Sequence, residues 1–367
     1  AMRSIILKVL LWIIIVNAFG FLAMNRFNLT PDTAYKWISP KNFPTEQSWD
    51  FVNMHNRWDS YWYLDIVQHG YYLKTDNTLA NIVFFPLYPT LMKIVGTVLL
   101  GNFVLAGWLL SSVFLVLGSV YFYRLVKEFH PSIDPELPLL IMLVFPTAFF
   151  LNVVYTEALF FFLSVSCFYY VFRQQFWKAG GIALLGALTH SNGVFLALPI
   201  FWETVRLHGW KSLFTMRLFP MALAPLGSFA FLSYHYFKFG DFFLFFQIES
   251  AWGRSFSLNW DHFSLFSHPS IVNMCIDIAF AVLIITALVL VYRNISKLYA
   301  VFMSLTVISA ITSGTLMSMG RYSLVLFPLF ILLATIKNRT VLQGWIFGSA
   351  LLLAMDIVLW VNNYWAG

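Results

Sequence analysis

The chain has 367 residues, of which 60% are hydrophobic and 10% are charged, and its formal net charge is +6. Soluble domains carry about 25% charged residues, so this composition excludes an ordinary soluble domain. Apolar runs of about twenty residues recur, and each is long enough to cross a hydrocarbon core of about 30 Å. The sequence therefore predicts a multi-pass membrane protein. The positive charge does not indicate nucleic-acid binding, because membrane proteins collect lysine and arginine in cytoplasmic loops and no basic tract is present.

The apolar runs give a predicted order of spans, and the lysines and arginines near their ends give the orientation. Arg3 and Lys8, beside the first run, predict that the N-terminus lies inside. Arg124 and Lys127 follow the second span and are also expected inside. The chain then ends outside. The predicted spans are 5–24, 103–123, 137–152, 155–172, 221–237, 271–292, 298–316, 322–336 and 341–360.

Three segments between these spans are predicted to have special roles. Segments 25–102 and 238–270 are expected to lie outside, the first as a loop with interfacial helices. Within the first, 84–100 is apolar but is interrupted by prolines and a lysine, so it either crosses the membrane or lies on its surface. Segment 180–202 is broken at its centre by the polar sequence HSNG, 190–193. A polar break at membrane depth is tolerated only where it is buried in protein or lines a cavity, so we expect a re-entrant pair of half-helices.

The stretch 57–72, RWDSYWYLDIVQHGYY, concentrates ionisable and aromatic residues in the first outer loop. Asp59 and Asp65 are six residues apart, so on a helix they point about 120° away from each other and do not form a paired-carboxylate site. Asp59 is suited either to capping a helix that begins at Ser60 or to acting as a catalytic carboxylate. The tryptophans and tyrosines are typical of the interfacial belt of membrane proteins. The residues alone leave both roles of Asp59 open.

Further ionisable residues fall on the same predicted outer face. Glu157 follows a tight turn between two spans, where an acid either stabilises the first turn of a helix or belongs to a site. His190 lies deeper, and it either lines a cavity or bonds to backbone groups freed by the helix break. Arg254 and Arg321 either anchor the chain to lipid headgroups or contact an anionic substrate.

The chain lacks the motifs of enzymes that use soluble cofactors or bind nucleotides. It contains no GxGxxG, P-loop, HExxH, GxSxG or Asp-x-Asp pattern. Its two cysteines, Cys167 and Cys275, lie within apolar runs and have neither disulfide nor metal-ligand spacing. We therefore expect no soluble-cofactor or nucleotide-phosphate chemistry, and we expect the two cysteines to act as small core hydrophobic residues.

Six of the motifs, taken together, resemble the PIG-V (GPI mannosyltransferase II) family of the GT-C glycosyltransferases. The resemblance implies an all-α integral membrane protein, a GT-C-type multi-pass helical bundle that forms one domain over 1–367. It also implies a catalytic aspartate in the large first outer loop, which falls on Asp59. His190 departs from the family, which carries arginine at that point. In the family's order the motifs are RWDSYWYLDIVQHGYY (57–72), FFPLYP (84–89), FPTAFFLNVVYTEALF (145–160), LTHSNG (188–193), FGDFFLFFQIESAWGRSF (239–256) and SGTLMSMGRYSLVLFPLF (313–330).

The resemblance further implies that the protein moves a sugar, mannose in the family, from a polyprenyl- or dolichyl-phosphate donor to a lipid-linked or membrane-associated acceptor. Glucose, galactose or a pentose would fit the same residues. The displacement would be single-step and inverting, without cofactor or metal, on the outer face of the plasma membrane in a prokaryote or the lumenal face of the endoplasmic reticulum in a eukaryote. Asp59 would be the base, with Glu157 as the second catalytic residue. The expected substrate-binding residues are Arg57, Asp65, His69, His190, Asn192, Arg254, Arg321 and Tyr322.

Two other classes of membrane protein are weighed against this interpretation. A transporter or lipid flippase places ionisable residues at mid-membrane and has internal repeats. Here the charges gather at one face and no repeat is visible, although Asp277 and Asp356 fall within predicted spans. A non-catalytic assembly subunit would not need the outer acids and arginines. The sequence therefore favours the enzyme.

Overall fold

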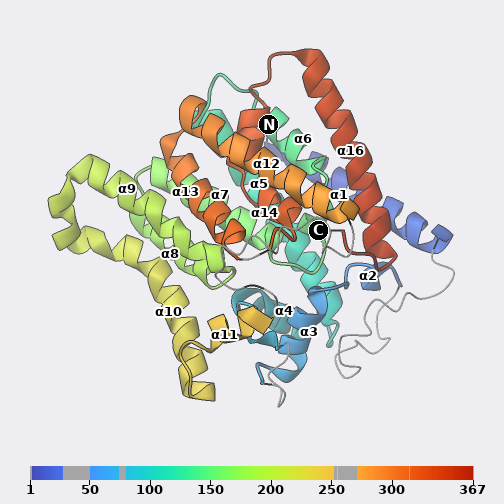
Figure 1. Cartoon of the computed structure of the whole chain (residues 1–367), viewed down its shortest axis with the longest axis horizontal. Coiled ribbons are helices and arrows are strands. Elements are labelled where there is room, and N and C mark those ends of the chain that lie inside the picture. Colours follow the sequence, from blue (N-terminus) through green and yellow to red (C-terminus); the bar gives the residue numbers. More distant parts are fainter. Residues whose placement is uncertain are drawn as a thin grey trace. The chain divides into compact units, whose positions relative to one another are not determined.

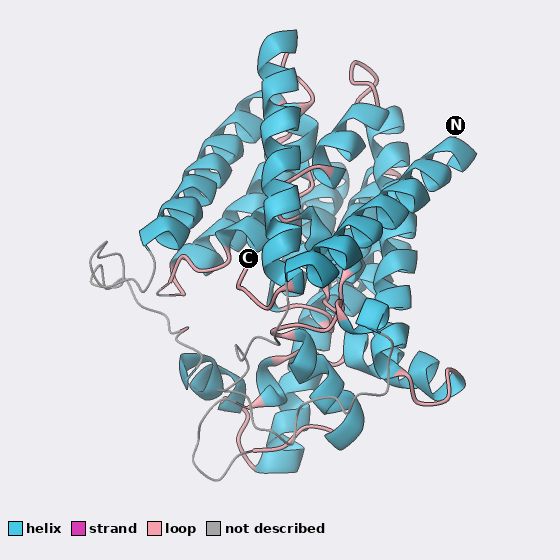
Figure 2. Cartoon of the chain, turned by 90° about the vertical axis from the view of Figure 1, so that its right-hand side faces the viewer, coloured by secondary structure: helices cyan, strands magenta, loops and turns pink. Residues whose placement is uncertain are grey.

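The structure is a computed structural model that describes residues 2–27, 50–73, 80–251, 254, 271–313 and 315–366. These residues form helices joined by loops, and no β-strand occurs among them (Figure 2). The predicted all-α class is therefore confirmed. Most of the predicted outer segment 238–270 beyond residue 251 lies outside the described residues, as do residues 28–49 of the first outer loop.

The helices are labelled in Figure 1. The α-helices are α1 (Met2–Phe27), α2 (Asp50–Asn53), α3 (Ser60–His69), α4 (Leu87–Val98), α5 (Phe103–Phe129), α6 (Glu136–Leu143), α7 (Glu157–Phe172), α8 (Phe176–Ala187), α9 (Ala197–His208), α10 (Phe219–Phe239), α11 (Leu244–Ala251), α12 (Ile271–Asn294), α13 (Lys297–Ile311), α14 (Met319–Leu324), α15 (Pro328–Leu333) and α16 (Arg339–Val361). The 3-10 helices are η2 (Asn81–Val83), η3 (Ala148–Asn152), η4 (Ser191–Leu196), η5 (Trp210–Phe214) and η6 (Met216–Leu218).

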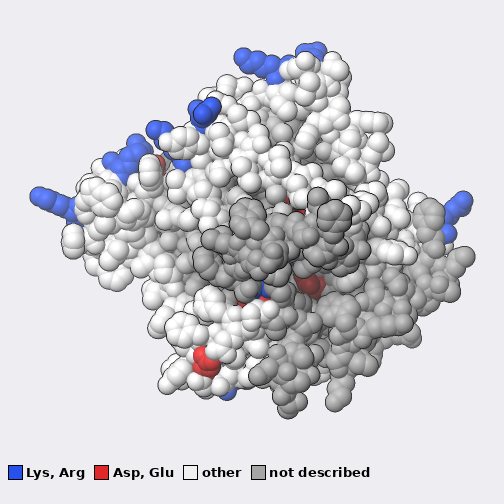
Figure 3. All heavy atoms as spheres, viewed as in Figure 1, with Lys and Arg blue, Asp and Glu red and all other residues white. Residues whose placement is uncertain are grey.

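Five helices of the described chain, α1, α5, α10, α12 and α16, are long and apolar enough to cross a membrane. They lie at the positions of five of the predicted spans. Their large apolar side chains are widely exposed, as lipid-facing side chains would be, with Leu22 on α1 and Phe347 on α16 among them. Figure 3 agrees, because most of the described surface on the face drawn is neither acidic nor basic.

The other predicted spans are shorter or interrupted. The apolar helices α7 and α13 have 16 and 15 residues. The expectation of one continuous helix over 137–152 is wrong, because α6 ends after eight residues and Pro146 follows. Segment 322–336 is likewise divided before Pro328. Proline lacks the backbone N–H, and its ring clashes with the carbonyl four residues earlier, which explains both breaks.

Helix α4 bears on the alternative that the sequence leaves open for segment 84–100. The helix has 12 residues and is therefore about 18 Å long. That is short of the roughly 30 Å needed to cross the hydrocarbon core. The structure therefore favours a helix that does not cross the membrane by itself.

The chain divides into two compact units, each described by itself below. The first unit comprises Ala1–Tyr72, Pro86–Phe162 and Ile336–Gly367, and the second comprises Leu73–Phe85 and Leu163–Thr335. In the first unit α1 packs against both α5 and α16, and α4 packs against α3 and α5. In the second unit α10 lies along α8, and α12 contacts α13, α14 and α15. The boundary falls within α7, after Phe162.

Candidate functional site

Asp59 occupies the N-cap position of α3 in the first unit, but its carboxylate does not cap that helix. Its φ and ψ are −61° and −19°, and no hydrogen bond joins its side chain to the first turn. A capping side chain normally needs an extended residue at this position, which explains the missing bond. The backbone is held instead, because the Asp59 N–H donates to the Tyr155 hydroxyl at 3.0 Å. The half-buried carboxylate is thus not used by the helix, and its catalytic role stays a prediction.

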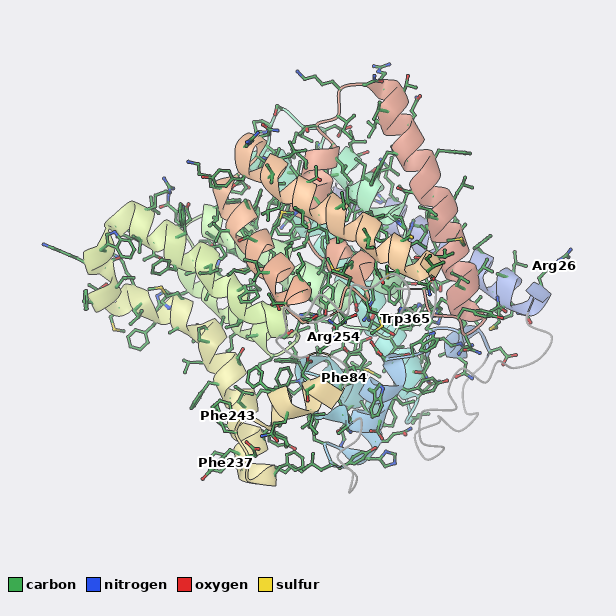
Figure 4. The ribbon with its side chains drawn as sticks, in the orientation of Figure 1. Arg26, Phe84, Phe237, Phe243, Arg254 and Trp365 are labelled. Atoms are coloured by element: carbon green, nitrogen blue, oxygen red, sulfur yellow. The ribbon has the colours of Figure 1, made fainter. Side chains whose placement is uncertain are left out.

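The residue before Asp59 is held in an unusual conformation. Trp58 has a positive φ of 53°, a conformation that costs a bulky residue roughly 1–2 kcal/mol. Its indole N–H donates to the Tyr364 carbonyl at 3.1 Å, and its ring lies 5.3 Å from that of Trp365 (Figure 4). These contacts tie the start of α3 to the segment after α16. Strain of this kind is often found at functional sites.

Buried tyrosines connect the Asp59 backbone with Glu157. Tyr155, which receives the Asp59 N–H, lies two residues before Glu157 at the start of α7. The Tyr155 carbonyl accepts a hydrogen bond from Ser111, whose hydroxyl lies 2.8 Å from that of Tyr88. Burial raises the pKa of the Tyr88 phenol, and the Glu157 charge raises it further. The Asp59 backbone is therefore joined to Tyr155, two residues before Glu157. The catalytic roles of both acids stay predictions, and Glu157 also fits the helix-dipole role.

Three other predicted residues of the first unit have partners within it. The Arg57 guanidinium donates to the carbonyls of Asn53 and Asn56, at 2.5 and 3.0 Å. Asp65 is buried and lies 3.0 Å from the Nδ1 atom of His69, one turn along α3. These contacts stabilise the turn before α3 and α3 itself. The substrate-binding role expected for these three residues stays a prediction.

A second group of predicted residues meets in the second unit, and we call His190, Arg254, Arg321 and Tyr322 the arginine–histidine cluster. Arg254, labelled in Figure 4, donates from Nη1 to the Tyr322 hydroxyl at 2.7 Å and from Nη2 to the Met317 carbonyl at 3.3 Å. Its guanidinium also lies 5.4 Å from the centre of the Tyr322 ring. The His190 ring lies edge-on to the same tyrosine, with 6.5 Å between centroids. Residues distant in sequence thus converge on Tyr322.

Arg321 is placed by the short helix α14. Its Nη2 atom donates to the Ser318 hydroxyl at 3.2 Å, and Ser318 adopts a left-handed φ of 73° before the helix begins. Asp277 on α12 accepts a hydrogen bond from the Met319 N–H at 3.3 Å. A carboxylate at a helix start satisfies backbone donors that have no partner within the helix. Asp277 therefore anchors the turn that presents Arg321 and Tyr322.

The chain turns at the polar sequence 190–193, and a glycine contact explains the geometry of this turn. Helix α8 ends at Ala187 and the chain returns through η4. A Cβ atom on Gly193 would lie 2.0 Å from the Gly186 carbonyl oxygen, so only glycine permits this approach. The backbone N–H of the buried Asn192 donates to the Nδ1 atom of His190 at 3.1 Å. A neutral His190 ring therefore carries its proton on Nε2. Whether the pair re-enters the membrane stays a prediction.

The charge state of His190 makes the stability of the protein depend on pH. Burial, and then the positive charges of Arg321 and Arg254, lower the pKa of His190 to about 4, whereas an unfolded histidine titrates near 6.5. The unfolded chain therefore binds more protons between these values, and this contribution to stability, complete above about pH 6.5, is lost as the pH falls toward 4. We expect the free energy of unfolding to fall by about 1.4 kcal/mol per pH unit from this group.

The measurement is denaturant unfolding of the purified protein in detergent between pH 4 and pH 7, compared with His190→Gln. The variant should show a shallower decline because glutamine does not titrate. An identical slope in both proteins would contradict the assignment to His190.

Comparison with known proteins gives a partial match. No family model matches the chain. A segment of 150 residues is 31% identical to the GPI alpha-1,6-mannosyltransferase 2 of Rattus norvegicus, covering 38% of this chain and 29% of the rat protein. The protein of the same name from Mus musculus gives the same identity and coverage. The chain is similar in part to a mannosyltransferase. The match spans less than a third of the length of these curated relatives.

Several polar residues near the predicted site are not singled out by the sequence analysis. They are Asn17 on α1, His55 before α3, Asn152 in η3 and Glu249 on α11. Burial raises the pKa of Glu249, while Arg254 acts in the opposite direction. An amide inside the first apolar span is unusual in lipid, and that signal alone could have identified Asn17.

Among the described residues no three His, Cys, Asp or Glu side chains form a potential metal site, and independence from metal stays a prediction.

Proposed function

We propose that the protein is a glycosyltransferase that moves a sugar from a polyprenyl- or dolichyl-phosphate donor to a hydroxyl group of a lipid-linked or membrane-associated acceptor. The observation that carries the proposal is the arginine–histidine cluster, in which the charges of two guanidinium groups act on a half-buried histidine. The partial similarity to a mannosyltransferase favours mannose as the sugar. In this proposal the protein belongs to the GT-C class and resembles PIG-V enzymes.

The cluster has the chemistry needed to bind a lipid phosphate. Guanidinium groups match the geometry of phosphate oxygens and stay charged in a site with little water. Arg254 already orients the Tyr322 hydroxyl, so a phosphate would meet a preorganised donor set. The donor remains in the membrane because of its polyprenyl chain, and a multi-pass protein can bring its residues to that lipid. Preorganised positive charge of this kind stabilises charge that develops in the transition state.

The reaction is a single displacement at the anomeric carbon. The acceptor hydroxyl oxygen forms a bond to that carbon as its proton passes to the Asp59 carboxylate. The bond between the anomeric carbon and the phosphate oxygen breaks, and the phosphate leaves with the electron pair on its lipid. Arg254 and Arg321 balance the charge of the departing phosphate, so no general acid is required. The configuration at the anomeric carbon inverts, and Glu157 orients the acceptor.

The structure gives Asp277, which could have indicated a transporter or flippase, a structural role. Asp277 lies on a long apolar helix, where a carboxylate is a mark of transport sites. Its hydrogen bond to the Met319 N–H gives it a local task at the start of α14. Asp277 thus supports the enzyme by placing the turn that carries Arg321.

A donor screen tests the proposed function. The purified protein is incubated with polyprenyl-phosphate mannose, glucose, galactose or arabinose, each labelled in the sugar, together with extracted membrane lipids. Mass analysis should find free polyprenyl phosphate and a glycolipid, with mannose as the best donor. Water-soluble mannose 1-phosphate is the matched control and should not react. Movement of the intact donor between leaflets without cleavage would support a flippase. The absence of both transfer and movement would support a subunit without activity.

A further inference from the structure

A buried amide lies in the middle of the first long apolar helix. Asn17 on α1 exposes 2% of its surface. Its Nδ2 group donates to the Ile13 carbonyl at 2.7 Å and to the Asn152 Oδ1 atom of η3 at 2.6 Å. The same Asn152 oxygen receives the Trp108 indole N–H from α5 at 3.1 Å. Asn17 is thus joined by hydrogen bonds to a second segment, which is in turn bonded to a second long helix.

The remaining side-chain atom of this amide meets a buried histidine. With its single proton on Nε2, a neutral His55 ring donates to the Asn17 Oδ1 atom. Its Nδ1 atom, which then carries no proton, lies 3.0 Å from the Val52 carbonyl. The His55 ring is fully buried and stacks on Trp108, with 4.8 Å between centroids and 27° between planes. His55 follows α2 and lies four residues before Asp59. The chain of hydrogen bonds therefore leads from the spanning helix to the segment that carries the predicted base.

The backbone around His55 is fixed as firmly as its ring. Its carbonyl accepts a hydrogen bond from the Val154 N–H at 3.2 Å. The neighbouring Met54 carbonyl accepts one from the Trp360 indole of α16 at 2.8 Å. Val154 is followed by Tyr155, whose hydroxyl receives the Asp59 N–H. Segment 55–59 is therefore attached at both ends to the same short stretch, 154–155.

Burying the polar side chains of Asn17 and His55 lowers the stability of the fold compared with apolar side chains, so we ask what the network provides in return. A buried amide or imidazole destabilises an apolar core unless it finds hydrogen-bond partners, and a network of such bonds rigidifies the part of the core that contains it. A leucine in place of Asn17 would pack between the helices without any polar partner. The network instead determines where the backbone before Asp59 lies relative to α1 and α5.

We propose that Asn17 and His55 are positioning residues for Asp59. Asn17 fixes the His55 ring, and His55 fixes the backbone that places the Asp59 carboxylate for proton transfer. This inference rests on the proposed function of Asp59 as the base. Neither residue contacts the reacting atoms in this account. They act on turnover and not on the affinity for the donor.

The kinetic test uses Asn17→Leu and His55→Phe, which remove the hydrogen bonds and keep apolar volume. Each is expected to lower kcat by roughly 10- to 100-fold, as small misplacements of catalytic groups do, while KM for the donor stays unchanged. The double variant should lose no more than the worse single variant, because both break one chain of contacts. His55→Gln should recover much of the loss, since its amide can still donate to the Asn17 oxygen.

The matched control is Asn25→Leu, on the same helix. Asn25 is exposed, and its amide donates to the Phe21 carbonyl, four residues earlier, just as Asn17 bonds to Ile13. The substitution removes the same kind of local bond without touching His55, so kcat should not change. The proposal would be overturned if Asn25→Leu lowered kcat as much as Asn17→Leu does. It would also be overturned if the losses of kcat in Asn17→Leu and His55→Phe multiplied in the double variant.

A second measurement does not depend on activity. Hydrogen–deuterium exchange of peptides covering 53–63 reports how well the Asp59 N–H is protected by Tyr155. Asn17→Leu and His55→Phe should speed exchange in these peptides and leave α12 unchanged, and His55→Gln should restore protection. Exchange in 53–63 that is the same in the variants as in the wild type overturns the positioning role. If Asn17→Leu does not fold, the comparison of His55→Phe with His55→Gln provides the same test. If the variants exchange faster in 53–63 but the wild-type protein transfers no sugar, the proposed function alone is refuted.

Discussion

Asp59→Asn is expected to lower kcat for sugar transfer by about 10²–10⁴-fold, the usual contribution of a positioned general base. The amide cannot accept the proton of the acceptor hydroxyl, although it fills the same space. Folding should be preserved, because α3 does not use the carboxylate as a cap and Tyr155 binds the backbone N–H, which asparagine retains. Initial rates with saturating donor and acceptor measure the effect, and thermal unfolding in detergent checks the fold.

The matched control for this substitution is Asp50→Asn. Asp50 is an exposed acid in the first turn of α2, nine residues before Asp59. Both residues belong to the predicted first outer loop. Its loss should leave kcat within about twofold, since an exposed charge of this kind contributes little. Turnover by Asp59→Asn at the wild-type rate would eliminate Asp59 as the base.

Arg321→Ala is expected to raise the donor KM by about 10- to 100-fold, because a hydrogen bond to a charged group contributes roughly 1.5–3 kcal/mol. The substitution removes one of the two guanidinium groups whose charges reach His190. The pKa of His190 should rise as a consequence, since the Arg321 charge lowers it. Equilibrium binding of labelled polyprenyl-phosphate mannose to detergent-solubilised protein measures the affinity without turnover.

Arg217→Ala serves as the control for Arg321→Ala. Arg217 lies in η6 and is exposed, so it tests whether any loss of positive charge weakens the binding of an anionic lipid. Its donor affinity should match that of the wild type. An Arg321→Ala variant with unchanged donor affinity would remove Arg321 from the phosphate site.

Hydropathy was sufficient to predict the long helices, because twenty consecutive apolar residues are a local feature. It failed at 137–152 and 322–336. There the apolar run is continuous while Pro146 and Pro328 divide the helices, and the backbone effect of proline outweighs hydropathy. Helix α4 shows the same limit, since composition does not tell a short surface helix from a span.

The candidate site was predictable where its residues lie in local motifs and not where it depends on long-range contacts. Asp59, Arg254 and Arg321 stand out from an apolar chain by charge alone. Asn17 and His55 are 38 positions apart, and Asn17 and Asn152 are 135 apart. No pattern within a single window links such residues. The packing of α1, α2 and η3 against α5 brings them together.

The central claim divides the work between a base, Asp59, and the cations that bind the lipid phosphate. Single turnover of pre-bound polyprenyl-phosphate mannose by the wild type and by Asp59→Asn tests that division most directly. We expect both proteins to bind the donor with equal affinity, and only the wild type to convert it to free polyprenyl phosphate and glycolipid when acceptor is added. Conversion of the bound donor by Asp59→Asn at the wild-type rate would contradict the account.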